Sequence, residues 1–340
     1  MLDTLDMFGA AARLAEQVAT AAELARKVPD LPDAAGVTSV VVFGMGGSGI
    51  GGDVLAALAG PSCPVPIVVA KGYECPAHVG PGTLVFASSF SGNTQETMIA
   101  AQAARDAGAR LVVLAEGGEL ARLAGEWGAP HLPIAPGLPM PRAGIAAVSV
   151  PLLVTLSRLG LCEEIDDHVD ATVAQLERRI PTLRGEGSPA AALARRIGRT
   201  MPIVYGDSTI GAVAAKRWKC QFNENPKVPA FANEIPELTH NEICGWAQHG
   251  DVTRQVFSAI LLRHDHEHEL NRRRFDLTGE ISEEIVADVH TVTAEGDGPM
   301  AQLFDLIVQG DFVTLELAVQ SGVDPGPIPV LDGIKAAMAR

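Results

Sequence analysis

Aromatic side chains and positive charge are both scarce in this sequence. Only 4% of the 340 residues are aromatic, and the 26 lysines and arginines are outnumbered by 41 aspartates and glutamates, which gives a net charge of −15 at pH 7. Binding of a nucleic-acid backbone requires a basic surface, whereas the longest basic run here is residues 272–274. We therefore expect no nucleic-acid partner. A small anionic ligand remains compatible with this charge, because one phosphate needs only a local site.

Long apolar runs and paired cysteines are missing as well. No stretch approaches the roughly 18 consecutive apolar residues of a membrane-spanning helix, and residues 1–6 lack the basic region of a signal peptide. The five cysteines are scattered, odd in number and never spaced as Cys-x-x-Cys, which argues against a disulfide framework and a zinc knuckle. We expect a cytoplasmic protein that does not contact a membrane and whose cysteines are reduced.

Glycine and apolar residues, by contrast, are abundant. The chain has 35 glycines and is 47% hydrophobic, enough for the cores of two ordinary domains. An apolar run at residues 37–43 leads into the glycine-rich segment 44–53 and then into a helical pattern, and further apolar runs alternate with helical stretches. This alternation predicts a parallel β-sheet covered by helices on both faces.

A second unit of the same kind begins about half the chain further on. A charged helical stretch and the Gly/Pro/Ser turn at residues 185–189 precede another strand, loop and helix, from Pro202 to Lys219. We predict an α/β protein with a first domain at 1–160 that includes an N-terminal helix, a helical connection at 161–194, and a second domain at 195–340 with a C-terminal helix.

The glycine loop of the first unit suits an anion. Its glycines let the backbone approach a ligand and direct N–H groups at it, next to the positive end of the following helix; Gly47 and Ser48 are candidate phosphate ligands. The loop also fits the dinucleotide pattern Gly-x-Gly-x-x-Gly at residues 44–49. Lys71, after the next strand, leaves NADP as an alternative. A tight turn without a ligand is the third reading.

A second loop strengthens the phosphate interpretation. After the apolar run at residues 83–88, Ser89, Ser91 and Thr94 lie on a glycine-containing turn that opens a helix. Their hydroxyls can donate hydrogen bonds to phosphate oxygens together with the backbone N–H groups. The alternative is a helix cap formed by Thr94 and Thr97.

These two loops resemble those of the sugar isomerase (SIS) superfamily, whose members bind phosphosugars between parallel-sheet domains. Further motifs are similar to the bifunctional phosphoglucose/phosphomannose isomerase family: Trp-Lys-x-Gln-x-Asn-Glu-Asn at 218–225, Asn-Glu-x-Pro-Glu-Leu-x-His-Asn-Glu at 233–242, Pro-x-Pro-Arg at 139–142 and a late lysine, Lys335. The similarity covers nearly the whole chain. It implies two SIS-type domains, each a parallel β-sheet flanked by helices.

The resemblance also implies a role for each matched residue. Ser48, Ser89, Ser91 and Thr94 would hold the 6-phosphate of the sugar, and Arg142 would lie near the reacting carbons. Glu224 would move the proton between C1 and C2. His240, contributed by the neighbouring subunit of a homodimer, and Lys335 would assist opening of the sugar ring.

Without the family, the residues alone leave these roles open. Isomerisation needs a carboxylate, a cation and a titratable acid–base group, but Glu234, Glu237 and Glu242 are as eligible as Glu224. Considered alone, His240 is more typical of a structural histidine than of a catalytic one, and Lys335 is more typical of a solvent-exposed lysine on a helix.

Three further features bear on the prediction. The alternating histidines of residues 264–268 could ligate a metal, but they are more typical of a polar turn before a helix. Cys220 stands where we expect a small polar residue, and Gly326 where relatives often carry threonine, so the preference between the glucose and mannose epimers stays open.

We therefore expect an aldose–ketose isomerase that interconverts glucose 6-phosphate, mannose 6-phosphate and fructose 6-phosphate through a cis-enediol, with no metal and no cofactor. The alternatives are a non-catalytic SIS-type sugar-phosphate sensor and an NADP-binding dehydrogenase.

Overall fold

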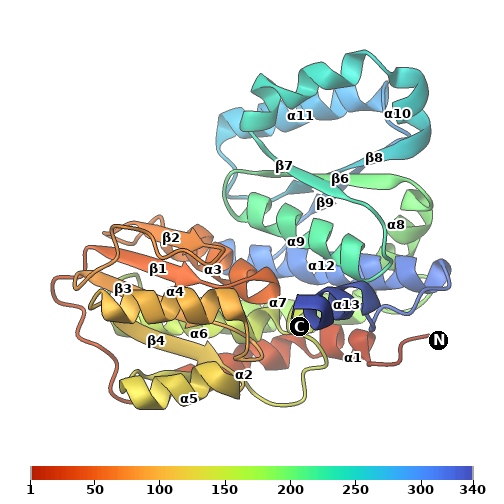
Figure 1. Ribbon diagram of the computed structural model, residues 1–340. Coiled ribbons are helices and arrows are strands. Elements are labelled where there is room, and N and C mark those ends of the chain that lie inside the picture. Colours follow the sequence, from red (N-terminus) through yellow and green to blue (C-terminus); the bar gives the residue numbers. More distant parts are fainter. Residues whose placement is uncertain (1, 339–340) are drawn as a thin grey trace. The chain divides into compact units, whose positions relative to one another are not determined.

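The computed structural model describes residues 2–338, except for the side chain of Ala247, and divides them into two compact units (Figure 1). The first-sheet unit contains residues 13–176 and 296–301. The second-sheet unit contains residues 2–12, 177–295 and 302–338. The domain limits expected at residues 160 and 195 stay a prediction. The helix at residues 14–26 groups with the first-sheet unit, whereas residues 2–12 group with the second-sheet unit.

The first-sheet unit contains a five-stranded parallel sheet in the order β2-β1-β3-β4-β5. Its strands are β1 (Ser39–Phe43), β2 (Ile67–Ala70), β3 (Thr83–Ser88), β4 (Arg110–Ala115) and β5 (His131–Pro133). Its helices are α2 (Leu14–Arg26), α3 (Gly46–Ala59), α4 (Gln95–Asp106), α5 (Gly118–Trp127), the 3₁₀ turn η1 (Pro141–Ala143), α6 (Ile145–Arg158) and most of α7 (Asp166–Arg179). The two central strands β1 and β3 consist mostly of apolar residues, with three consecutive valines in β1, and are buried along their whole length.

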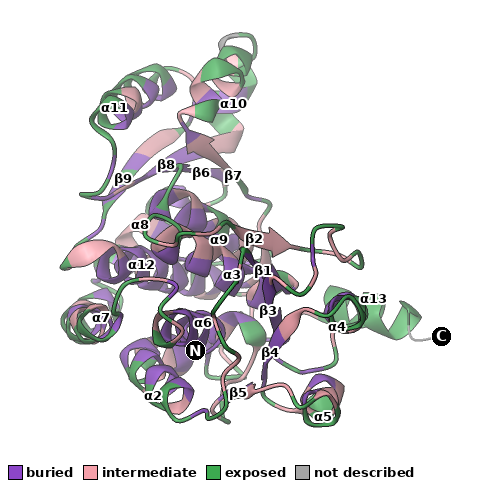
Figure 2. Ribbon diagram, turned by 90° about the vertical axis from the view of Figure 1, so that its left-hand side faces the viewer, coloured by how far each residue is buried: buried purple, intermediate pink, exposed green. Residues whose placement is uncertain are grey.

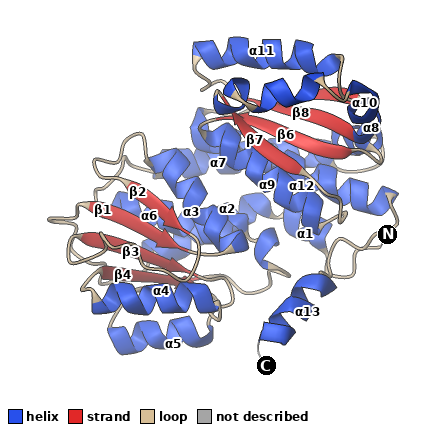
Figure 3. Ribbon diagram, turned by 45° about the horizontal axis from the view of Figure 1, so that its top comes forward, coloured by secondary structure: helices blue, strands red, loops and turns tan. Residues whose placement is uncertain are grey.

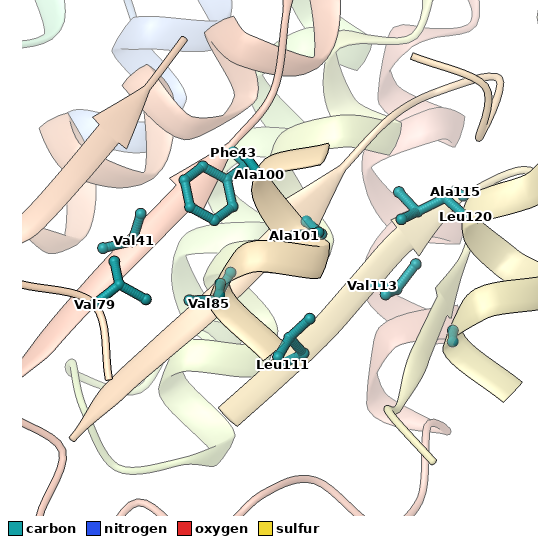
Figure 4. Packing of buried hydrophobic residues seen from close by; sticks show 13 residues of the cluster. Val41, Phe43, Val79, Val85, Ala100, Ala101, Leu111, Val113, Ala115 and Leu120 are labelled. Carbon is teal, nitrogen blue, oxygen red and sulfur yellow. The ribbon is translucent and has the colours of Figure 1, made fainter. Parts of the chain in front are cut away.

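Helices cover both faces of this sheet. On one face Val41, Val85 and Val113 pack against α4 and α5, where the alanines at 100, 101 and 104 let the helix approach closely (Figure 4). On the other face α3 lies so close that a Cβ on Gly52 would come within 2.9 Å of Val42. Alternate residues of each strand therefore belong to different cores, which explains the continuous apolar runs of the sequence.

The second-sheet unit contains a four-stranded parallel sheet in the order β7-β6-β8-β9; Figure 3 shows β7, β6 and β8 side by side. Its strands are β6 (Met201–Asp207), β7 (Phe231–Ile235), β8 (Phe257–Arg263) and β9 (Asp288–Thr293). Its helices are α1 (Met7–Ala12), η2 (Ile180–Leu183), α8 (Pro189–Ile197), α9 (Ile210–Glu224), η3 (Glu237–His240), η4 (Glu242–Ala247), α10 (Gly250–Val256), α11 (Glu269–Glu283), most of α12 (Gly298–Gln320) and α13 (Pro329–Met338). On one face Tyr205 and Leu261 pack against Phe275 of α11, while α9 covers the other.

Buried polar bonds join α9 to α12 within this unit. Gln221 donates to Asp311 at 2.6 Å, and Asn225 donates to Thr314 at 3.0 Å. A Cβ on Gly310 would lie only 2.4 Å from the Trp218 indole, so only glycine allows this close approach. Most of α12 is buried, whereas no residue of α13 is (Figure 2). The α9–α12 pair therefore gives the C-terminal end of α9 a rigid support.

The expected architecture, two parallel sheets flanked by helices, is confirmed. Residues 2–12 join the second-sheet unit through Phe8, whose ring packs on Phe312, and through Thr4, which donates to Asp324 at 2.7 Å. In the described part of the chain, no helix has both the length and the apolar character needed to cross a membrane.

Candidate active site

Hydroxyl groups meet at the carboxyl edge of the first sheet. β1 and β3 are neighbours in the sheet, so the loops that follow them lie side by side, at the position where open α/β sheets bind ligands. Ser48, which is 4% exposed, accepts a hydrogen bond at 2.9 Å from the backbone N–H of Phe90 in the loop after β3. This bond connects the two loops that the sequence assigned to phosphate binding.

Ser89 and Thr94 form a second pair of hydroxyls in this place. Their oxygens are 2.8 Å apart, and Ser89 is fully buried. Thr94 precedes α4, but its side chain makes no capping hydrogen bond to the helix, so the capping alternative is wrong for this residue. The hydroxyls and the positive end of α4 therefore share one location, as an anion site requires.

The turn between these residues depends on glycine. Gly92 has φ +69°, and a Cβ there would lie 1.8 Å from the Gly117 carbonyl oxygen. Ser91, just before it, is exposed, and its hydroxyl accepts a hydrogen bond from the N–H of Asn93 at 3.3 Å. Ser91 thus stabilises the loop and stays accessible at its surface.

Arg142 lies next to the glycine loop. A Cβ on Gly47 would be 3.2 Å from the backbone of Pro141, so η1 packs directly on this loop. Arg142 in η1 is 3% exposed, so its positive charge is buried in the short turn that packs on the glycine loop. The structure thus brings Gly47, Ser48 and Arg142 together.

Lys71 does not offer the free cation that the NADP alternative needs. Its ammonium lies 2.6 Å and 2.7 Å from the two carboxylate oxygens of Asp53. A lysine paired in this way is a weak ligand for a 2′-phosphate, because the neighbouring carboxylate repels the anion. The glycine loop therefore favours a phosphate held by hydroxyls over a dinucleotide.

Glu224 is the last residue of α9 and is half-buried. The buried bonds of Gln221 and Asn225 to α12 flank it on its own helix. Just beyond, Lys227 donates to the carbonyl of Asp324 at 2.6 Å. The loop that leads to α13, which carries Lys335, therefore lies beside the segment after Glu224.

His240 ends η3 and is exposed. It follows the end of β7, whereas Glu224 precedes the beginning of that strand. The five residues of β7 span about 16 Å at roughly 3.3 Å per residue. η3 also lies on the α11 face of the sheet, through buried Leu238, and α9 covers the opposite face. The structure does not bring Glu224 and His240 of one chain together.

Comparisons with known proteins show the family of the chain. Residues 186–338 match the model of the bacterial phospho-glucose isomerase C-terminal SIS domain. A bifunctional phosphoglucose/phosphomannose isomerase of Caldicellulosiruptor bescii is 36% identical over 98% of this chain and 99% of its own, and one of Aquifex aeolicus is 31% identical over 88% and 90%. The chain belongs to the bifunctional phosphoglucose/phosphomannose isomerase family. It is an isomerase, as the sequence motifs predict.

Solved structures share the SIS-type fold. A hypothetical protein of Thermus thermophilus superposes with a TM-score of 0.74 at 16% identity, covering 98% of this chain and 90% of that one. The C-terminal domain of glucosamine-fructose-6-phosphate aminotransferase of Francisella tularensis superposes with a TM-score of 0.70 at 12% identity, covering 94% and 98%. These similarities confirm the expected fold class of this member of the isomerase family.

The corresponding edge of the second sheet is closed by side chains, a feature that the sequence did not reveal. Asp207 at the end of β6 and His264 after β8 are both buried, and His264 Nε2 lies 2.7 Å from Asp207 Oδ1. Burial alone would raise the pKa of Asp207, but the hydrogen bonds from His264 and Thr209 lower it overall. Among residues 2–338, no group of three His, Cys, Asp or Glu side chains could hold a metal ion.

The structure shows the surroundings of Cys220 and Gly326, the two residues that differ from those expected from the resemblance. Cys220 is half-buried on α9, one turn before Glu224. Gly326 donates its N–H to Asp324 at 3.0 Å, and a Cβ there would lie 2.8 Å from Leu5. A threonine at residue 326 would therefore require Leu5 to move.

Proposed function

We propose that this isomerase interconverts glucose 6-phosphate, mannose 6-phosphate and fructose 6-phosphate by proton transfer between C1 and C2 through a cis-enediol, without a metal ion or cofactor. The observation that carries the proposal is the group of hydroxyls at the carboxyl edge of the first sheet, with buried Arg142 beside it. The relatives are named as phosphoglucose/phosphomannose isomerases, which supports the proposed substrates.

The 6-phosphate binds at the first sheet in this proposal. Ser48, Ser89, Ser91 and Thr94 donate to its oxygens, and the N–H groups of Gly47 and of the first turn of α4 add further donors. The fixed spacing of the hydroxyls supports this role, because donors that are already oriented lose little entropy when the anion binds.

Glu224 is the base in this proposal, and Arg142 stabilises the charge that develops on the oxygens of the enediol. The planar enediol has lost its configuration at C2. Rotation about C2–C3 then presents either face to Glu224, which accounts for activity toward both epimers. The support of α9 by α12 favours a carboxylate with a fixed position.

Ring opening falls to Lys335 and to His240 of a second subunit in this proposal. Because Glu224 precedes β7 and His240 follows it, the two residues lie at opposite ends of this strand, and one chain cannot direct both at the same sugar. In a two-fold homodimer, each subunit can supply its His240 to the site that contains Glu224 of the other subunit, because the same surface of both subunits forms the interface.

The test is a coupled assay on both aldose phosphates, with and without a chelator, combined with exchange of the C2 proton in deuterated water. We expect interconversion and exchange with both epimers, unaffected by the chelator. Saturable binding of fructose 6-phosphate without interconversion or exchange would replace the isomerase proposal with that of a sugar-phosphate sensor.

A further inference from the structure

The short segment that carries His240 is fixed on both sides. Before it, the hydroxyl of Thr239 accepts a hydrogen bond at 2.7 Å from Arg274 of α11, and Leu238 is buried in the core. After it, the side chain of Asn241 donates to Glu237 at 2.6 Å. An exposed histidine between such anchors has a defined backbone, although its ring lies at the surface.

Glu242, two residues after His240, makes two more of these anchoring hydrogen bonds. Its Oε1 accepts from the Tyr205 hydroxyl at 2.5 Å, and its Oε2 accepts from the Asn233 amide at 2.6 Å. Tyr205 and Asn233 are register partners on β6 and β7, so two neighbouring strands hold one carboxylate. Trp246 donates to the same Tyr205 hydroxyl at 3.2 Å.

The chemistry of this clamp requires a carboxylate. Burial of Tyr205, and then its hydrogen bond to the charged Glu242, raise the pKa of the phenol, so it remains a donor at neutral pH. The Asn233 amide must also donate, because its oxygen already accepts from the N–H of Glu234 at 2.8 Å. A glutamine at residue 242 has only one acceptor oxygen, so it can accept from Tyr205 or from Asn233 but not from both; if it keeps the bond from Tyr205, its own NH₂ faces that of Asn233.

We infer that Glu242 is a positioning residue for His240, held by Tyr205 and Asn233 so that the imidazole two residues earlier is presented in one orientation. The inference rests on the proposed role of His240 in the isomerase reaction. It also assigns Glu242 a task other than that of the base, since both of its oxygens accept hydrogen bonds within its own subunit. Small displacements of an acid–base group reduce the rate steeply.

The test is a double-mutant cycle of Glu242→Gln and His240→Ala, with kcat and KM measured for glucose 6-phosphate. We expect Glu242→Gln to lower kcat by about tenfold with KM within about twofold, and to cost less than about twofold when His240 is already alanine. Glu280→Gln, an exposed glutamate of α11, is the matched control. The inference would be overturned if Glu242→Gln lowered kcat by the same factor in the wild-type and the His240→Ala background.

A second-site rescue separates positioning from general damage. Asn233→Asp combined with Glu242→Gln restores the second hydrogen bond with donor and acceptor exchanged, while the new Asp oxygen still accepts from Glu234 N–H. We expect kcat to return to within about threefold of wild type. Failure of the rescue in a protein with wild-type thermal stability would contradict the inference.

The proposed function can fail separately. If His240→Ala retained full kcat while Glu224→Gln abolished it, the role of His240, and with it this inference, would be wrong but the isomerase would stand. If Glu242→Gln did not fold, Tyr205→Phe removes only one of the two donors, and we expect it to lower kcat by about threefold without affecting KM.

Discussion

Replacing Thr94 with valine removes one hydroxyl of the phosphate site and preserves the shape of the side chain. A hydrogen bond to a charged group contributes about 1.5–3 kcal/mol, so the loss of one donor to the phosphate should lower kcat/KM for fructose 6-phosphate by about 10- to 150-fold. The Ser89 hydroxyl, 2.8 Å away, loses one of its two partners and keeps the backbone N–H of residue 94 at 3.4 Å. This should reduce the free energy of unfolding by about 1 kcal/mol.

Two assays separate binding from folding. Inhibition by inorganic phosphate should weaken in parallel with kcat/KM, and thermal unfolding should report the small loss of stability. Thr97→Val is the matched control on the same helix: Thr97 is 1% exposed and its hydroxyl has no hydrogen-bond partner, so valine there should retain the phosphate inhibition and slightly raise the stability. Equal phosphate inhibition of the Thr94→Val variant and wild type would refute the assignment of the anion site.

Three other measurements address the base, the assembly and the second sheet. Glu224→Gln should retain fructose 6-phosphate binding but lose exchange at C2 by a factor on the order of 10², with Glu234→Gln as the control; retained exchange would rule out Glu224 as the base. Glu224→Gln and His240→Ala subunits, refolded in equal amounts, should recover about a quarter of wild-type activity, and verified heterodimers without activity would indicate a site within one chain. The pKa of Asp207 is lowered in the folded protein, so the ionised side chain stabilises the fold above the ordinary pKa of about 3.9, and this stabilisation is lost as the pH falls further. The free energies of unfolding of wild type and Asp207→Asn, measured with urea, should therefore differ at pH 7 and converge in acid. A difference that stays the same at both pH values would contradict this.

Much of the first-sheet site follows from the sequence alone. An apolar run that ends in a glycine or hydroxyl-rich loop locates the carboxyl end of a parallel strand, and in such a sheet these ends meet at one edge. Ser48 and Ser89 are therefore expected near one another when β1 pairs with β3, and the observed register, Phe43 opposite Ala87, aligns the ends of the two strands. The connection through Phe90 N–H is a detail of the fold that the motif does not contain.

The four glutamates around residue 230 show where sequence reasoning ends. Neither the residue type nor the spacing of these glutamates along the sequence shows which one is the base. Glu242 is set apart only because β6 and β7 pair with Tyr205 opposite Asn233, and that register is a contact between segments almost 30 residues apart. Contacts of residues 2–12 with the C-terminal part of the chain are likewise invisible to local periodicity, because periodicity reports only which face of an element is buried.

The length of β7 constrains how the acid–base groups can act together. A base and a general acid in one isomerisation must each reach the substrate within hydrogen-bond distance, ~3 Å, yet Glu224 and His240 of one subunit are separated by a strand of about 16 Å and by the thickness of the sheet. The half-buried Glu224 is supported from within its own unit, whereas the exposed His240 is held on a rigid segment at the surface. A residue that is fixed in its backbone and open to solvent is suited to completing the site of another subunit, because its position is defined before the two subunits meet. In a two-fold dimer, the same surface would donate one histidine and receive the other, so both sites would form or fail together.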